Sequence, residues 1–293
     1  MKRAAFTSRW LPILLLLPQL AIIAIFFYLP AAQALHSSFY LQDPFGFGST
    51  FVGLDNYAEL AGNTEYMRIA RFTLVFTLLV TFFSLGFALL LAVKADNVLR
   101  GARTYRTLLM WVYAVAPPVA GFIGLIMFNQ SWGPITEFLG LLGWDFKLGV
   151  NFYDTAAAMV IVAVWKQVPV NFIFFLSGLQ SIPKPVREAA LIDNRSAAGR
   201  FWDVTFPLLA PTGFFLLITN ITYALFDTFG VLDQLVKGEP GNNPMTLVYK
   251  VYVDGFRGND LGGSSAQSVI LMILVLTLTV FQFRLVERRI HYT

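Results

Sequence analysis

Cysteine is absent from this chain of 293 residues, and histidine occurs only at His36 and His291. Without cysteine there can be no disulfide, no thiolate zinc ligand and no thiol nucleophile. A histidine-rich site is equally improbable with two histidines, so we expect no bound metal. The chain also contains no HExxH or GxSxG motif and no GxxxxGK[ST] phosphate loop. These absences argue against an intramembrane protease, a serine hydrolase and an ATP site within this chain.

Charge is scarce as well, because Asp, Glu, Lys and Arg make up 13% of the residues against 57% hydrophobic ones. A soluble core of this size could not bury so much apolar surface, which indicates a protein of the lipid bilayer. The formal net charge is +4, yet the basic residues stand in short groups at the ends of apolar runs. Such groups are typical of membrane-topology signals, and we expect no nucleic-acid partner.

Long apolar runs dominate the sequence, and about 20 such residues are needed to cross the hydrocarbon core. Six runs are long enough, near 11–35, 69–93, 107–128, 156–180, 208–232 and 265–285. The first follows a basic N-terminus as a signal peptide would, but its length favours a retained membrane anchor. We therefore predict an all-α polytopic membrane protein with six transmembrane helices in a single domain, residues 1–293.

The distribution of basic residues predicts the orientation of the chain. They gather at the N-terminus, in the second and fourth connections and at the C-terminus, namely Lys2, Arg3, Arg9, Lys94, Arg100, Arg103, Arg106, Lys184, Arg187, Arg195, Arg200, Arg284, Arg288 and Arg289. The positive-inside bias makes these segments, and hence both termini, cytoplasmic. The other three connections lean acidic and are expected to face outward.

One polar segment, residues 181–207, separates the fourth and fifth spans. Pro185 suits the first turn of a helix, and Asn194 can adopt the left-handed turn that would end it. Ser196 can cap a second helix that leads to Pro207 and Pro211, where we expect the fifth span to begin. The segment is predicted to form a short, rigid elbow of two helices at the cytoplasmic surface.

One face of the first of these helices carries Val186, Ala189 and Ala190, and the small alanines let another backbone approach closely. This pattern is typical of a docking surface for a partner protein. An amphipathic helix that rests on lipid headgroups would show the same residues. The residues alone leave both interpretations open.

The same segment resembles the EAA coupling loop of permeases from binding-protein-dependent ABC importers. The matching positions are Glu188, Ala189, Ala190, Asp193, Phe201 and Pro207. Asn194 and Arg195 stand where that family usually has Gly and Ala. Asn keeps the left-handed turn accessible at a modest strain, whereas Arg adds bulk and charge to the contact.

Other stretches extend the resemblance over essentially the whole chain. "VWKQVPVNFIFFLSGLQSIP" and "YALFDTFGVLDQ" are similar to the carbohydrate-uptake class of these permeases. "LQDPFGFGSTFVGLDNY" and "YAVAPPVAGF" resemble, more narrowly, permeases of glycerol-3-phosphate importers. The implied cargo is sn-glycerol-3-phosphate, with another small sugar or a glycerophosphodiester as the alternative.

The resemblance also implies a division of labour. This chain would have the type I ABC importer permease fold, with a coupling helix between helices 4 and 5, in a bacterial plasma (inner) membrane. It would be a non-catalytic subunit that pairs with a sister permease, docks on two ATP-binding cassette subunits and receives cargo from an extracytoplasmic binding protein. ATP and Mg would be bound by the ATPase subunits, and this chain would hold no cofactor.

A substrate path is predicted from residues that are unusual within membrane spans: Lys166, Asn171, Asn220, Asp227, Pro117 and Pro118. A lysine at mid-membrane costs about 2.5 to 3.5 kcal/mol on insertion scales, so Lys166 should face protein or water. It could attract a phosphate group, or it could bind backbone carbonyls or an acidic partner across a helix interface. The two asparagines could likewise contact cargo or join helices.

Asp227 could shape an outer gate or face water at a helix end, and the proline pair is expected to interrupt span three beside a cavity. Gly86, Gly121 and Gly124 are expected to permit close helix packing. An ion-coupled secondary transporter is the rival function. It usually requires buried carboxylates and inverted repeats, and no span here has an Asp or Glu at its centre.

Overall fold

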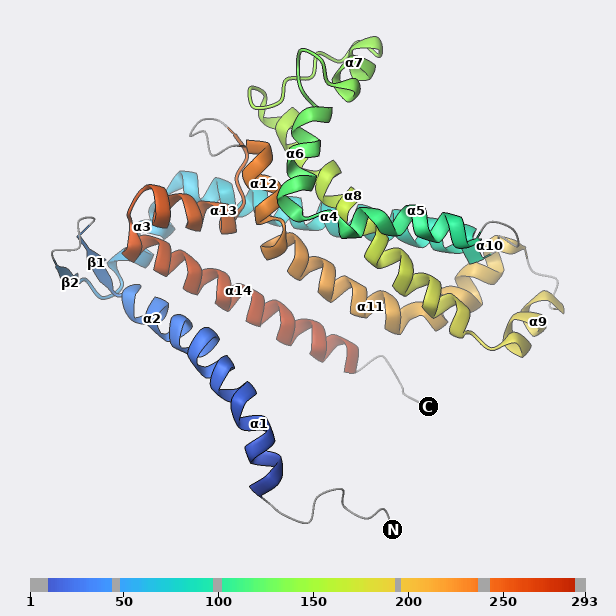
Figure 1. Ribbon diagram of the computed structural model, residues 1–293, viewed down its shortest axis with the longest axis horizontal. Coiled ribbons are helices and arrows are strands. Elements are labelled where there is room, and N and C mark those ends of the chain that lie inside the picture. The colour runs from blue at the N-terminus through green and yellow to red at the C-terminus, as the bar shows by residue number, and fades with distance from the viewer. Residues whose placement is uncertain (1–9, 44–47, 97–101, 193–195, 237–242, 288–293) are drawn as a thin grey trace. The chain divides into compact units, whose positions relative to one another are not determined.

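The computed structural model describes residues 10–43, 48–96, 102–192, 196–236 and 243–287. The chain divides into two compact units, of which unit 1 comprises residues 1–66 and 251–273 and unit 2 comprises residues 67–250 and 274–293. Helices and one short hairpin make up the described parts of both units. The ribbon and its colours along the chain are given in Figure 1.

Unit 1 begins with a long apolar helix whose side chains the rest of the unit leaves exposed. This helix consists of α1 (Trp10–Ile23), a π-helical turn (Ala24–Tyr28) and α2 (Leu29–Ser37), and its apolar stretch is 0% buried. A two-stranded antiparallel hairpin follows, with β1 (Tyr40–Gln42) paired to β2 (Ser49–Phe51). The predicted first membrane span is therefore present as a helix.

Small and polar residues hold the rest of unit 1 together. Helix α3 (Asp55–Gly62) supplies Asn56, whose Nδ2 donates to the carbonyls of Ser38 at 2.8 Å and Tyr40 at 3.2 Å. Gly262, near the start of α14 (Leu261–Glu287), lies so close to the Tyr40 carbonyl that a Cβ atom would come within 2.3 Å of its oxygen. Only glycine allows this approach of two backbones.

Unit 2 contains most of the membrane-spanning helices. Its elements, with those that continue into unit 1, are α4 (Thr64–Asp96), α5 (Ala102–Ala114), α6 (Pro117–Met127), α7 (Pro134–Leu141), α8 (Phe152–Ser181), α9 (Lys184–Ile192), α10 (Ala197–Arg200), a π turn (Phe201–Thr205), α11 (Phe206–Thr222), a π turn (Tyr223–Asp227), α12 (Phe229–Val236) and α13 (Leu247–Tyr252). A π turn (Val253–Arg257) follows in unit 1. Helix α8 is central, because it packs against α5, α6, α11 and α12.

Two glycines set the closest helix packing in unit 2. A Cβ at Gly121 of α6 would lie 2.3 Å from the Val231 carbonyl oxygen of α12, and a Cβ at Gly124 would lie 2.7 Å from Val162 of α8. The prediction for these two positions is confirmed. The prediction for Gly86 is wrong, since a Cβ there would meet nothing within 4 Å in this chain. A glycine in a helix marks close packing only where a neighbouring element actually crosses it.

Six spans were predicted, and the described residues agree. Five helices are long and apolar enough to cross a membrane, and a bent pair, Thr107–Ala114 with Pro117–Met127, makes the sixth. The pair bends by 105° where Ala116 adopts an extended conformation. Prolines at 117 and 118 have no N–H to donate to the carbonyls four residues earlier, so the helix cannot continue through them. The all-α, six-span prediction is confirmed.

The fifth span begins earlier than predicted. Helical structure runs from Ala197 to Asp227, and Pro207 and Pro211 lie inside it. A π turn precedes Pro207, in which the Phe206 N–H donates to the Phe201 carbonyl, five residues back. Such a turn re-routes backbone hydrogen bonds around a position that lacks a donor. Helical structure therefore begins before the predicted start of the span near residue 208, and the second helix of the elbow is continuous with the span.

Candidate functional site

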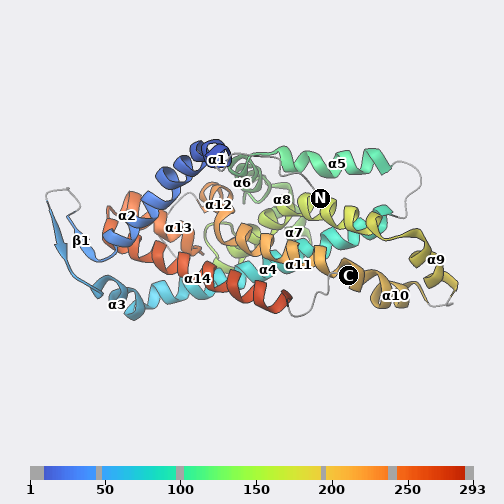
Figure 2. The ribbon, with the colours of Figure 1, turned by 90° about the horizontal axis from the view of Figure 1, so that it is seen from below.

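The segment between spans four and five folds largely as predicted. Residues 184–192 form α9, and Ser196 caps α10 by accepting a hydrogen bond from the Gly199 N–H at 3.1 Å. Helices α9 and α10 lie near each other in both views (Figure 1, Figure 2). Asp193 and Asn194, the predicted break between them, lie outside the described residues. What the structure provides is one short helix, followed by a second that continues into the membrane.

The surface of α9 differs from the predicted one at a single position. Val186, Glu188 and Ala189 are exposed, but Ala190 is only 7% exposed. The expectation that Val186, Ala189 and Ala190 share an exposed face is therefore wrong for Ala190, which faces the chain itself. Leu191 and Ile192 are instead the large apolar residues that α9 presents outward, at 59% and 83% exposure.

Arg187 attaches α9 to two other helices. Its Nη1 lies 2.9 Å from Oδ2 of Asp96, the last residue of α4, and its Nη2 donates to the carbonyl of Leu179 near the end of α8. The sequence indicated Arg187 only as a topology signal. The one available hint was Asp96, because an acidic residue at a helix C-terminus is electrostatically unfavourable unless a cation accompanies it.

Phe201 and Pro207, the remaining positions of the motif, belong to the start of the fifth span. Phe201 and Trp202 meet edge to face with ring centroids 5.1 Å apart, and the Trp202 ring centroid lies 5.0 Å from that of Phe206. Pro207 is exposed. The three rings form a cluster at the junction between the elbow and the span, and such aromatic pairs are favourable beyond the area that they bury.

Lys166 lies at the break in span three. Its Nζ donates to the Tyr113 carbonyl at 2.9 Å, approaches the Val112 carbonyl at 3.5 Å and lies 5.3 Å from the centre of the Tyr113 ring. In an unbroken helix the Tyr113 carbonyl would accept from residue 117, but proline has no N–H. Lys166 supplies the missing donor from α8. Of the two interpretations of this lysine, the geometry fits the binding of carbonyls across a helix interface.

Asn171 and Asn220 form a buried pair between α8 and α11. Asn220 Nδ2 donates to Asn171 Oδ1 at 2.7 Å, and Asn171 Nδ2 donates to Asn220 Oδ1 at 2.9 Å. Ser84 of α4 donates to the same Asn220 oxygen at 2.7 Å, and all three residues are 0% exposed. Each amide is satisfied by protein, so the cluster fits the joining of three helices.

Asp227 is exposed at the end of the helical stretch that begins at Ala197. Pro117 and Pro118 pack against Gly230 of α12, where a Cβ would come within 3.3 Å of both rings. The structure therefore brings Lys166 and the proline pair together at one break, and Asn171 and Asn220 at a second place. It does not gather the six predicted path residues around one cavity.

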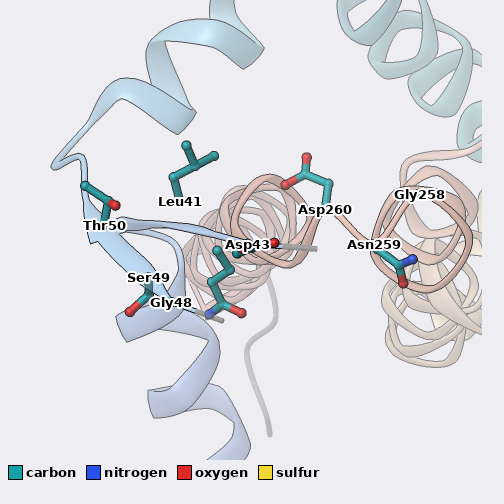
Figure 3. Close-up of a pocket in the computed structure, with 9 residues that line it drawn as sticks. Leu41, Asp43, Gly48, Ser49, Thr50, Gly258, Asn259 and Asp260 are labelled. Carbon is teal, nitrogen blue, oxygen red and sulfur yellow. The ribbon is translucent and has the colours of Figure 1, made fainter. Parts of the chain in front are cut away.

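Cavities within each unit lie elsewhere. One of about 780 Å³ in unit 2 is almost wholly apolar and is lined by α4, α5 and α8, with Phe87, Val112 and Trp165 among its residues. Another, of about 550 Å³ in unit 1, has several polar residues in its lining and lies between the β hairpin and the turn before α14 (Figure 3). Asp43 and Ser49 line it on one side, and Asn259 and Asp260 on the other. None of the six predicted path residues lines either cavity.

Long apolar helices, a broken span and buried polar contacts between helices place the chain among polytopic helical membrane proteins. Within that class it matches, over residues 1–292, the family of binding-protein-dependent transport system inner membrane components. The chain belongs to this family.

Two relatives and one solved structure show how close the match is. The chain is 49% identical to the sn-glycerol-3-phosphate transport system permease protein UgpA of Brucella suis biovar 1 (strain 1330), with 100% of both chains covered. It is 48% identical to the protein of the same name from Rhizobium meliloti (strain 1021), again over 100% of both. A bacterial alginate ABC transporter, solved with a periplasmic protein bound to an alginate pentasaccharide, shares the fold with a TM-score of 0.83 at 19% identity, over 95% of this chain and 94% of that one.

Proposed function

We propose that this chain is a permease subunit of an ATP-driven importer and that its cargo is sn-glycerol-3-phosphate. The observation that carries the proposal is the 49% identity, over the full length of both chains, to a permease named for that transport system. Another small sugar or a glycerophosphodiester is the alternative cargo. The substrate path forms between this chain and a sister permease, which is consistent with the absence of the six path residues from the cavities described within the units.

The source of energy lies outside this chain. Because the sequence has no GxxxxGK[ST] phosphate loop, ATP and Mg are bound and ATP is hydrolysed by two separate cassette subunits. Helix α9 is the element that contacts one of them, and both chain termini lie on that same, cytoplasmic side of the bacterial inner membrane. An extracytoplasmic binding protein delivers the cargo on the other side. The chain itself is non-catalytic and holds no cofactor.

Residue Glu188 offers a direct test of the coupling role. It is exposed on α9, so Glu188→Lys reverses a surface charge without disturbing a buried contact. In proteoliposomes that contain both permeases, the cassette subunits and the binding protein, we expect this variant to lose ATP-driven uptake while its insertion is unchanged. Retention of normal coupled uptake would contradict the assignment of α9.

The cargo is tested in the same vesicles. Uptake of labelled sn-glycerol-3-phosphate should require ATP and the cassette subunits, and an excess of unlabelled maltose-type sugar should not compete. Uptake that persists without the cassette subunits and collapses with an ionophore would instead identify an ion-coupled transporter.

A further inference from the structure

Arg187 holds the first helix of the loop between spans four and five in a defined rotation about its axis. Its guanidinium contacts two partners at once, the Asp96 carboxylate at 2.9 Å and the Leu179 carbonyl. Asp96 ends α4 and Leu179 lies near the end of α8, so the contact ties three helices together. A guanidinium can bridge two acceptors in this way because its N–H groups form a rigid fork, which an ammonium group lacks.

The contacts of Arg187 determine which side of α9 faces the rest of the chain. Residues three and four apart lie on one side of a helix, so Arg187 and Ala190 share the inner side of α9. Ala190 is correspondingly buried. Glu188 and Ile192, four residues apart, lie on the opposite side of the helix, and both are exposed.

The position of Asp96 supports a specific role for the pair. A carboxylate at the C-terminal end of a 33-residue helix lies at the negative end of the helix dipole and is disfavoured there. Its side chain is only 15% exposed, against 39% for Arg187. The ion pair with Arg187 compensates for this placement. Lys94, an exposed basic residue near the end of α4, has no ion pair among the described residues.

We infer that Arg187 and Asp96 are positioning residues: they fix the rotation of α9, so that Glu188 and Ile192 face the ATPase, and they pass its movement to α4 and α8. This inference rests on the proposed function. It assigns the docking face to residues on the opposite side from Ala190, and it names the two spans that receive the motion.

The test uses the complete complex in proteoliposomes and measures the cargo taken up per ATP hydrolysed. Arg187→Gln and Asp96→Asn should each lower this ratio at least about twofold, the lower end of what the loss of a direct contact between two residues produces. The charge-exchanged double variant Asp96→Arg with Arg187→Asp should regain much of the ratio, because it restores the ion pair. It should not regain all of it, because a carboxylate at position 187 cannot donate to the Leu179 carbonyl. Lys94→Gln, the matched control on α4, should leave the ratio unchanged.

The outcomes separate the inference from the proposed function. If the natural chain shows no ATP-dependent uptake, the proposed function is wrong, and so is the inference about Arg187 and Asp96 that rests on it. If uptake by the natural chain requires ATP but both single variants keep its ratio of cargo to ATP, only the inference about Arg187 and Asp96 is wrong. Should a single variant fail to accumulate in the membrane, the charge-exchanged variant decides, since coupled uptake in it supports the pair and its failure overturns the pair.

Discussion

At the scale of single residues, two buried polar contacts explain why costly side chains are present within the spans. Lys166 replaces a donor that proline removes, and Asn171 with Asn220 satisfies two amides against each other. A buried polar group without a hydrogen-bond partner costs free energy. Each contact therefore matters mainly because its removal would leave such a group unpaired. Both residue types were noticed from the sequence as path candidates, but their partners are 49 to 54 positions away along the chain.

Removal of the Lys166 ammonium should destabilise the protein. Lys166→Met leaves the Tyr113 carbonyl without its donor, and we expect a loss of about 1 to 3 kcal/mol in the free energy of unfolding. Lys166→Arg should retain most of the stability. Thermal unfolding of the detergent-purified chain measures the effect. If the Lys166→Met variant is as stable as the natural chain but has a raised KM for cargo, Lys166 contacts the substrate instead.

The asparagine pair should behave as one unit. Asn171→Leu or Asn220→Leu leaves one buried amide without its partner and should cost about 1 kcal/mol, within the range measured between membrane helices. The double variant Asn171→Leu with Asn220→Leu should cost less than the two single losses added together. A double-variant cycle by thermal unfolding checks this, and strict additivity would show that the two amides act independently.

At the scale of elements, prolines and glycines decide the path of the chain. The same residue type has opposite outcomes here: Pro117 and Pro118 break span three by 105°, whereas Pro207 and Pro211 sit inside a continuous helix. A π turn before Pro207 re-routes the backbone hydrogen bonds there, whereas Ala116, before Pro117, adopts an extended conformation. The residue pattern predicted a helix boundary at each pair, because a π turn leaves no simple signal in it.

The break in span three and Lys166 should be coupled energetically. Pro117→Ala restores the N–H that the Tyr113 carbonyl lacks, so Lys166→Met should cost less in a Pro117→Ala background than in the natural chain. Thermal unfolding of the four variants of this cycle measures the difference. An equal cost of Lys166→Met in both backgrounds would mean that the lysine does not substitute for the missing donor.

Glycine substitutions give a matched comparison of two helices. Gly121→Ala places a Cβ 2.3 Å from the Val231 carbonyl oxygen and should separate α6 from α12, with a loss of about 1 to 3 kcal/mol typical of overpacking. Gly86→Ala meets nothing in this chain and should leave the stability of the isolated subunit unchanged or slightly raised. Equal losses at both positions would contradict the packing described for α6.

At the scale of the whole molecule, the first apolar helix is 0% buried, and the family to which the protein belongs consists of transport-system components. Because the chain contains no cysteine, a single introduced cysteine can report which side of the membrane a residue faces. A single introduced thiol can be labelled without any background from native residues.

The orientation of α9 is tested with that probe. Ala189 is exposed, so Ala189→Cys should react with a membrane-impermeant maleimide in inverted vesicles and remain protected in intact spheroplasts. Adding the cassette subunits should slow the reaction, because they would cover α9. Labelling from the outside would contradict the predicted topology and the coupling role together.

The amino-acid sequence by itself determined the number of spans, their approximate limits and the helical loop between spans four and five. These features follow from local quantities, namely the length of apolar runs, the period of the helix and the placement of prolines and caps. The tertiary structure alone decided that Ala190 is buried, that Arg187 meets Asp96 and that Lys166 meets Tyr113. Those contacts depend on which helix faces cross, and because hydrophobic matching in a lipid-facing bundle is nearly uniform, only the packed geometry selects them.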